Sequence, residues 1–202
     1  METGGESHDA HRALDDLLAS VRSCRLCENE LEHGVRPVFQ LDSAARVLIA
    51  GQAPGRQVHR TGVPFDDASG ERLRDWMGIS RAVFHDASRV AILPMAFCYP
   101  GRGRYGDLPP PGLCAATWRS ALLAHLDSVR LTLVIGAAAA SWHLETRKSL
   151  TDSVRSFRDY LPSCIPLPHP SPRNNPWLAK NPWFARDVLP ELRSWVRSAL
   201  GG

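Results

Sequence analysis

The chain has 202 residues, 44% of them hydrophobic, and its formal net charge at pH 7 is only +3. This length suits one domain with a buried core, and the small charge permits a nucleic-acid partner without indicating one. The longest apolar run, from Leu131 to Trp142, is too short to cross a bilayer, and the acidic N-terminus lacks the apolar segment of a signal peptide. We therefore expect one intracellular, cytoplasmic domain over residues 1–202, with a disordered leader at 1–9 and no membrane association.

Short apolar runs alternate with segments of helical periodicity along the chain. Aliphatic and β-branched residues predict buried strands at about 46–50, 89–97, 131–136 and 164–167. Apolar residues at helical spacing predict helices at about 10–21, 70–77, 113–127, 137–144, 154–160 and 183–199. Between them, residues 51–68 and 99–112 are predicted to be loops. This alternation indicates the α/β class, and we expect a three-layer α/β/α sandwich with a central four-stranded parallel sheet.

Two polar segments follow the first and the fourth predicted strands. The first contains Gly51-Gln-Ala-Pro-Gly55 and Pro64-Phe65-Asp66-Asp67, and the second is His169-Pro-Ser-Pro-Arg-Asn174. Because ligands bind at the carboxyl ends of the strands in open α/β sheets, we expect both segments to line one pocket. An amide, an aromatic ring, carboxylates and a histidine suit a flat ring that forms hydrogen bonds. The candidate residues are Gln52, Phe65, Asp66, Asp67, His169, Ser171, Arg173 and Asn174.

These segments resemble the motifs of the uracil-DNA glycosylase superfamily over about residues 24–195. Gly51–Gly55 resembles the first motif, and Thr61-Gly-Val-Pro-Phe65 resembles the segment that stacks an aromatic ring on a flipped base. His169–Asn174 resembles the second motif of the single-strand-selective monofunctional uracil glycosylases. The resemblance implies a monofunctional DNA glycosylase of base excision repair, which flips uracil or a related deaminated base from DNA and hydrolyses its N-glycosidic bond.

DNA is the partner that this resemblance implies, and the implied location is the nucleoid. We also expect a monomer, and no nucleotide cofactor, since the sequence contains no GxxxxGK[ST] loop.

The resemblance also implies a role for each pocket residue. His169 stabilises negative charge on the leaving base, and Phe65 stacks on that base. The residues expected to bind the base are Gly51, Gln52, Ala53, Phe65 and Asn174, and those expected to contact DNA are Ser171, Arg173 and Trp177. His59, Arg102 and Arg104 are further candidates for DNA contacts. Read from the residues alone, His169 also fits a structural histidine, Phe65 fits core packing and Asn174 fits an ordinary turn.

The first motif departs from family 4 of the superfamily, which has glutamate where this chain has Gln52. Gln52 can position a substrate but cannot act as a base, so Asp66 and Asp67 are the nearest candidate catalytic carboxylates. Family 5 has an aspartate close to this place, after its stacking aromatic, which favours Asp67. Either carboxylate also fits a solvated turn or a helix cap.

The asparagine with which family 4 reads uracil is not found in Leu93–Phe97, which leaves the preferred base open. The alternative function is a module of the same fold that binds damaged or single-stranded DNA with little or no catalysis. A nucleotide hydrolase that uses the same edge of the sheet is a third hypothesis.

Five cysteines in an intracellular chain do not suit a disulfide framework, so ligation of a metal or cluster is the alternative to buried thiols. Cys24-x2-Cys27 followed by Cys98-x15-Cys114 resembles the pattern that ligates a 4Fe–4S cluster in family 4. The resemblance implies a structural cluster that ties the N-terminal helix to the loop at 99–112. A zinc half-site at the first pair and simple packing at the second are the alternatives, and Cys164 is expected to be buried in its strand.

Overall fold

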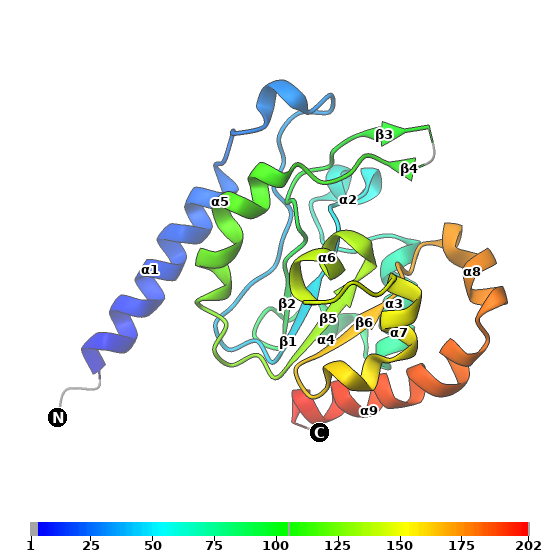
Figure 1. Ribbon diagram of the computed structural model, residues 1–202. Coiled ribbons are helices and arrows are strands. Elements are labelled where there is room, and N and C mark those ends of the chain that lie inside the picture. Colours follow the sequence, from blue (N-terminus) through cyan, green and yellow to red (C-terminus); the bar gives the residue numbers. More distant parts are fainter. Residues whose placement is uncertain (1–3, 105, 202) are drawn as a thin grey trace.

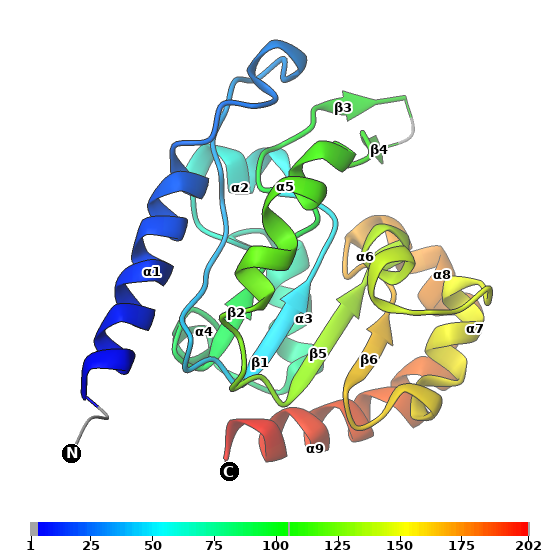
Figure 2. The ribbon, with the colours of Figure 1, turned by 60° about the vertical axis from the view of Figure 1, so that its left-hand side comes forward.

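The fold is organised around one parallel sheet in the computed structural model, which describes residues 4–104 and 106–201 (Figures 1 and 2). The strands are β1 (Val47–Ala50), β2 (Val90–Ile92), β5 (Leu131–Ile135) and β6 (Cys164–Leu167), in the order β2-β1-β5-β6. All three pairings of neighbouring strands are parallel. The predicted four-stranded parallel sheet is therefore confirmed. Strand β2 is shorter than the apolar run that predicted it, although the N–H groups of Leu93 and Met95 still donate to the carbonyl oxygens of Ile49 and Gly51 beyond its end.

Helices cover both faces of this sheet, as the predicted three-layer sandwich requires. One face is covered by α3 (Ala68–Met77), α4 (Arg81–Phe84), the π-helical turn η4 (Phe184–Val188) and α9 (Leu189–Leu200). The other face is covered by α1 (Gly4–Arg22), α5 (Gly112–Leu123) and α6 (Gly136–His143). Beside the edge strand β6 lie α7 (Leu150–Arg155) and the turn η2 (Phe157–Tyr160). Figures 1 and 2 both show α1 alongside α5.

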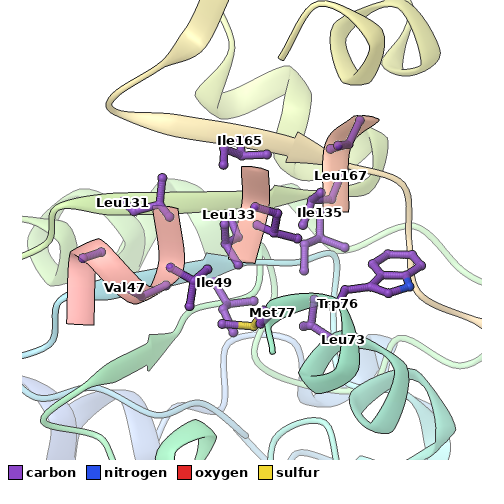
Figure 3. Close-up of a cluster of buried hydrophobic side chains, with 14 of the residues drawn as sticks. Val47, Ile49, Leu73, Trp76, Met77, Leu131, Leu133, Ile135, Ile165 and Leu167 are labelled. Carbon is purple, nitrogen blue, oxygen red and sulfur yellow. The ribbon is translucent and has the colours of Figure 1, made fainter. Parts of the chain in front are cut away.

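Both faces of the sheet are buried because successive residues of a strand point to opposite sides. Val47 and Ile49 of β1 are fully buried on the side of α3, where Leu73 and Met77 pack against them (Figure 3). Leu48 lies between them in sequence and belongs instead to the core beneath α1 and α5. This is the burial that a continuously apolar strand predicts.

The sequence analysis did not predict several short helices and strands. Helix α2 (Arg56–Thr61) lies in the predicted loop at 51–68, and an antiparallel hairpin of β3 (Arg102–Gly103) and β4 (Gly106–Asp107) lies in the predicted loop at 99–112. The remaining elements of this kind are η1 (Glu28–Glu30), α4, η3 (Pro172–Asn174) and α8 (Asn175–Lys180). Elements this short show no measurable periodicity, so the pattern of apolar residues could not reveal them.

The N-terminal region also differs from expectation. Helix α1 begins at Gly4, inside the predicted leader, whose residues 1–3 lie outside the described part of the chain. Within the described residues, no helix combines the length and the apolar character needed to span a membrane.

Candidate active site

A cavity of about 410 Å³ lies at the edge of the sheet where the strands end. The segment Gly51–Gly55 after β1 and His169 after β6 line it, so the structure brings together the two segments that the sequence placed at this edge. Phe65 and Asp67 enter from the chain that precedes α3. The hairpin contributes Asp107.

Phe65 forms a rigid part of the cavity wall. Its φ angle of 54° is uncommon for a residue with a side chain. Helix α3 holds this conformation from behind: a Cβ atom on Gly70 would lie 1.8 Å from the Phe65 carbonyl oxygen, so only glycine permits the contact. Arg74 Nη1 donates to the same oxygen at 3.4 Å. The Phe65 ring packs edge-on against Phe84, with 5.9 Å between the ring centroids, and a Cβ atom on Gly51 would lie 3.8 Å from its Cζ.

His169 is held in one orientation by its own loop. The Ser171 N–H donates to His169 Nδ1 at 3.1 Å, and Asn174 Nδ2 donates to the His169 carbonyl oxygen at 2.7 Å. Because Nδ1 accepts a hydrogen bond, the neutral ring carries its proton on Nε2. Burial lowers the pKa of His169, although the nearby carboxylates of Asp67 and Asp107 act in the opposite direction. The ring therefore presents an Nε2–H donor, which has no hydrogen-bond partner among the described residues.

Two carboxylates lie close to one point beside Gly55. The Oδ2 atoms of Asp67 and Asp107 are 3.8 and 3.9 Å from the position that a Cβ atom on Gly55 would occupy. Asp67 Oδ1 also accepts from the Gly70 N–H at 2.9 Å and so caps the N-terminus of α3. Sequence reasoning missed Asp107. Its only signal was a position in a segment rich in glycine and proline after the second strand.

The other predicted carboxylate, Asp66, does not line the cavity. It pairs with Arg81 at 2.7 Å, and this hydrogen bond lowers the pKa of Asp66. Phe65 and Asp66 are adjacent, but the chain turns at Phe65 and sends the Asp66 side chain towards α4. Of the two candidate carboxylates, the structure brings only Asp67 into the cavity.

Gln52 links the loop after β1 to the hairpin. Its Nε2 donates to the Leu108 carbonyl oxygen at 3.2 Å. The carbonyl oxygens of Gly51 and Gln52 accept from Met95 and Ala96 at 2.9 and 3.1 Å, which fixes the loop to the segment after β2. Gly51, Gln52 and Ala53 all line the cavity, and their contact with a base stays a prediction.

Two residues predicted to touch the base or DNA have other partners. Asn174 is absent from the cavity wall, and its amide holds the His169 carbonyl oxygen. Trp177 Nε1 donates to Thr151 Oγ1 at 2.9 Å, and its ring packs against Trp183. Asn174 therefore supports His169, whereas Trp177 packs in the hydrophobic core on the α9 side of the sheet.

The remaining predicted DNA contacts divide into two groups. Ser171, Arg173 and Arg102 line the cavity, and Arg173 also reaches the hairpin, because a Cβ atom on Gly106 would lie 3.3 Å from its Nη1. Arg104 is exposed on the hairpin outside the cavity lining. His59 also lies outside that lining, with Nε2 3.2 Å from the His33 carbonyl oxygen.

The four cysteines of the predicted cluster lie around a second, apolar cavity of about 20 Å³. Burial raises the pKa of Cys98 and raises that of Cys114 to about 11, and the neighbouring thiols act in the same direction. Cys24 and Cys27 complete the set. Cys164 is only half-buried in β6 and lies outside this cavity.

No three His, Cys, Asp or Glu side chains in the described parts of the chain converge closely enough to hold one metal ion. A 4Fe–4S cluster makes a different demand, because each thiolate binds a different iron atom at a corner of the cluster. Four thiols around one apolar cavity fit this demand in donor type and number.

Comparison with models of protein families matches residues 38–193 with the model described as "Uracil DNA glycosylase superfamily". The match covers more than half of the chain. It includes every residue that lines the active-site cavity, and it begins after Cys24 and Cys27.

Proposed function

The chain belongs to the uracil DNA glycosylase superfamily, and on this basis we propose that it is a monofunctional DNA glycosylase. Its substrate is uracil or a related deaminated base in DNA, and its product is an abasic site. The observation that carries the proposal is the placement of the Phe65 ring and the fixed imidazole of His169 in the wall of one cavity. At about 410 Å³, this cavity falls within the range of pockets that bind small molecules.

Phe65 provides the stacking surface for a base that has left the helix. Flipping a nucleotide costs a few kcal/mol, and stacking on an aromatic side chain returns about 1–3 kcal/mol per base. The ring needs no rearrangement to do this, because Gly70, Arg74 and Phe84 already hold it in place. The backbone N–H groups around Gln52 and Ala53 supply donors at the edge of the bound base.

His169 stabilises the leaving base. As the N-glycosidic bond breaks, negative charge grows on the base and is shared by its carbonyl oxygens. A neutral imidazole with its proton on Nε2 donates to such an oxygen, and the Ser171 N–H keeps the proton on that nitrogen. A single donor of this kind contributes about 10²–10³-fold to the rate of an acyl-transfer enzyme, and we expect a similar contribution here.

Charged groups around the cavity suit the sugar and the phosphates of a DNA substrate. Asp67 offers one free oxygen, Oδ2, whose negative charge stabilises the oxocarbenium-like sugar. Arg102 and Arg173 lie on the cavity lining, where guanidinium groups can neutralise DNA phosphates.

The test is a cleavage assay on labelled oligonucleotides that carry a single uracil, hypoxanthine or xanthine. We expect strand breakage only after alkali treatment, because a monofunctional glycosylase leaves an abasic site and an intact backbone. Breakage without alkali would identify a lyase instead. Binding without cleavage on all three substrates would contradict the enzyme and favour the DNA-binding module.

We also propose that Cys24, Cys27, Cys98 and Cys114 hold a structural 4Fe–4S cluster. The supporting observation is their shared apolar cavity, and the cluster would join the end of α1 to both roots of the hairpin segment. Protein purified without oxygen should be brown and contain iron, and Cys98→Ala should lose both properties. Cys164→Ala is the matched control and should keep them. Iron-free protein from an anaerobic preparation would contradict the cluster.

A further inference from the structure

The cavity contains one carboxylate, that of Asp107, which makes no hydrogen bond or ion pair with the described residues. Asp67 uses Oδ1 to cap α3, which ties that side chain to the helix. Asp107 accepts no hydrogen bond and forms no ion pair with any described residue, and its side chain is exposed on the cavity lining. Both oxygens of Asp107 are therefore available to a water molecule.

Asp107 also lies near the second carboxylate of the cavity. Its Oδ2 approaches the same point beside Gly55 as Asp67 Oδ2, and both carboxylates act electrostatically on His169. The same cavity therefore contains the donor for the leaving base, a fixed negative charge and a free carboxylate.

Two backbone hydrogen bonds of the next residue, Leu108, fix the position of Asp107. Within the hairpin, Leu108 N–H donates to the Gly101 carbonyl oxygen at 3.0 Å. Arg102 of β3 lies opposite Asp107 of β4 in the antiparallel register of the two strands. From outside the hairpin, Gln52 Nε2 donates to the Leu108 carbonyl oxygen. Glutamate at position 52 could not make this bond when ionised, because it has no N–H group and would set a carboxylate against a carbonyl oxygen.

We propose that Asp107 is the general base that activates the attacking water, and that Gln52 is a positioning residue that holds Asp107 through Leu108. This inference rests on the proposed glycosylase function. It gives a physical reason for an amide at position 52. The carboxylate of Asp107 enters the cavity from the hairpin, and the Gln52 side chain ties the hairpin to the loop after β1.

The chemical step balances as one hydrolysis. The bond between C1′ and the base nitrogen breaks, and its electron pair leaves with the base, whose carbonyl oxygen is stabilised by His169. The water oxygen forms a bond to C1′ while Asp107 accepts one proton from that water. The proton passes through solvent to the base anion, so the products are an abasic deoxyribose and the neutral base.

The first experiment measures single-turnover cleavage by Asp107→Asn, which keeps the size of the side chain and removes its basicity. We expect a rate at least about 10²-fold below the parent. Affinity for DNA with an uncleavable base analogue should stay within threefold. Asp67→Asn retains an N-capping side chain and should lose less activity than Asp107→Asn. Asp127→Asn is the matched control, since Asp127 is exposed in the segment that precedes β5, at the other end of the sheet.

The second experiment tests the tether with Gln52→Glu. Alone, this variant should lower the single-turnover rate about 10-fold or more, and it should speed amide hydrogen exchange in the peptide that spans residues 99–111. In the Asp107→Asn background it should cause no further loss of rate, because both changes act on the same carboxylate. A merely structural role for Gln52 would give additive losses.

The outcomes separate this inference from the proposed function. A parent enzyme that cleaves while Asp107→Asn retains its rate would overturn the inference and leave the glycosylase intact. A Gln52→Glu variant that is faster than the parent would overturn the tether, because it would mean that a carboxylate is needed at position 52 itself. A parent that cleaves none of the three substrates would overturn both.

Discussion

The active-site cavity has two walls that are built in different ways. The sheet wall consists of Gly51–Gly55, Phe65 and His169. Close contacts hold each part: the segment after β2 holds the first, α3 holds Phe65, and the loop after β6 holds His169. The hairpin wall consists of Arg102 and Asp107, whose side chains are exposed, and Leu108 follows Asp107 in the chain. The side-chain bond between Gln52 and Leu108 joins the two walls. The roles that we propose follow this division: stacking and leaving-group stabilisation are assigned to the rigid wall, and activation of water is assigned to the exposed wall.

Among changes to the sheet wall, His169→Ala should cause the largest loss of activity. We expect the single-turnover rate of base release to fall by about 10²–10³-fold, because the variant removes a fixed donor to the developing anion. Affinity for DNA should change much less. His125→Ala, near the end of α5 and away from the cavity lining, is the control and should cleave at the parent rate. A His169→Ala variant as fast as the parent would show that the leaving base is stabilised elsewhere.

The next largest effect should come from the support of the sheet wall, at Gly70. Gly70→Ala would force a Cβ atom to within 1.8 Å of the Phe65 carbonyl oxygen, so either α3 or the Phe65 segment must move. We expect the free energy of unfolding to fall by about 1–3 kcal/mol. Gly112→Ala is the matched control: Gly112 is also in a helix, nothing lies within 4 Å of the added atom, and stability should not fall. Urea denaturation of both variants checks this, and equal stabilities would contradict the close contact.

The same contrast explains what the sequence could predict. The sequence could predict the sheet wall because Gly51–Gly55 and His169 come soon after strands, and parallel strands bring their carboxyl ends to one edge. Phe65 lies further along the loop that begins at Gly51. Thus Gln52, Phe65 and His169 were placed together from the pattern alone. The four buried strands were equally accessible, because a run such as Val47–Ala50 with both faces apolar has few other interpretations.

The sequence could not predict the hairpin wall, for physical reasons. Strands of two residues, such as Arg102–Gly103, have no periodicity, and the pairing that places Asp107 in the cavity depends on contacts distant in sequence. The choice between Asp66 and Asp67 could not be derived from the residues alone, although the resemblance to family 5 favoured Asp67. It depends on the unusual backbone angle at Phe65, which turns one carboxylate to Arg81 and the other into the cavity.

A smaller effect should distinguish the walls in their contact with DNA. Arg102 belongs to the hairpin wall, and Arg173 reaches the hairpin beside Gly106. If each neutralises one phosphate, Arg102→Ala and Arg173→Ala should each reduce the slope of log affinity against log salt by about 1. Arg12→Ala, on the exposed face of α1, should leave the slope unchanged. Titrations at several salt concentrations measure this. Unchanged slopes for both variants would place the DNA path elsewhere.

The smallest effect concerns the buried Arg119 and its half-buried partner His143, which lie behind the sheet wall. Arg119 Nη1 donates to the carbonyl oxygens of Leu93 and Pro94 at 3.1 and 3.2 Å, and Pro94 lines the cavity. Arg119 Nη2 contacts His143 Nε2, which must accept because a guanidinium only donates. Burial, reinforced by the positive charge of Arg119, lowers the pKa of His143 to about 4.

This shift has a defined effect on stability. Between pH 6.5 and about pH 4, His143 binds a proton in the unfolded chain and not in the folded one, so the free energy of unfolding falls as the pH is lowered through this window. The contribution of one proton is at most about 1.4 kcal/mol per pH unit. His143→Gln keeps an acceptor for Arg119 and cannot titrate. Its denaturation midpoints should therefore fall less steeply than those of the parent from pH 6.5 to 4 and run parallel to them above pH 7. Identical slopes in both windows would show that folding does not lower the pKa of His143, and would contradict its contact with the Arg119 guanidinium.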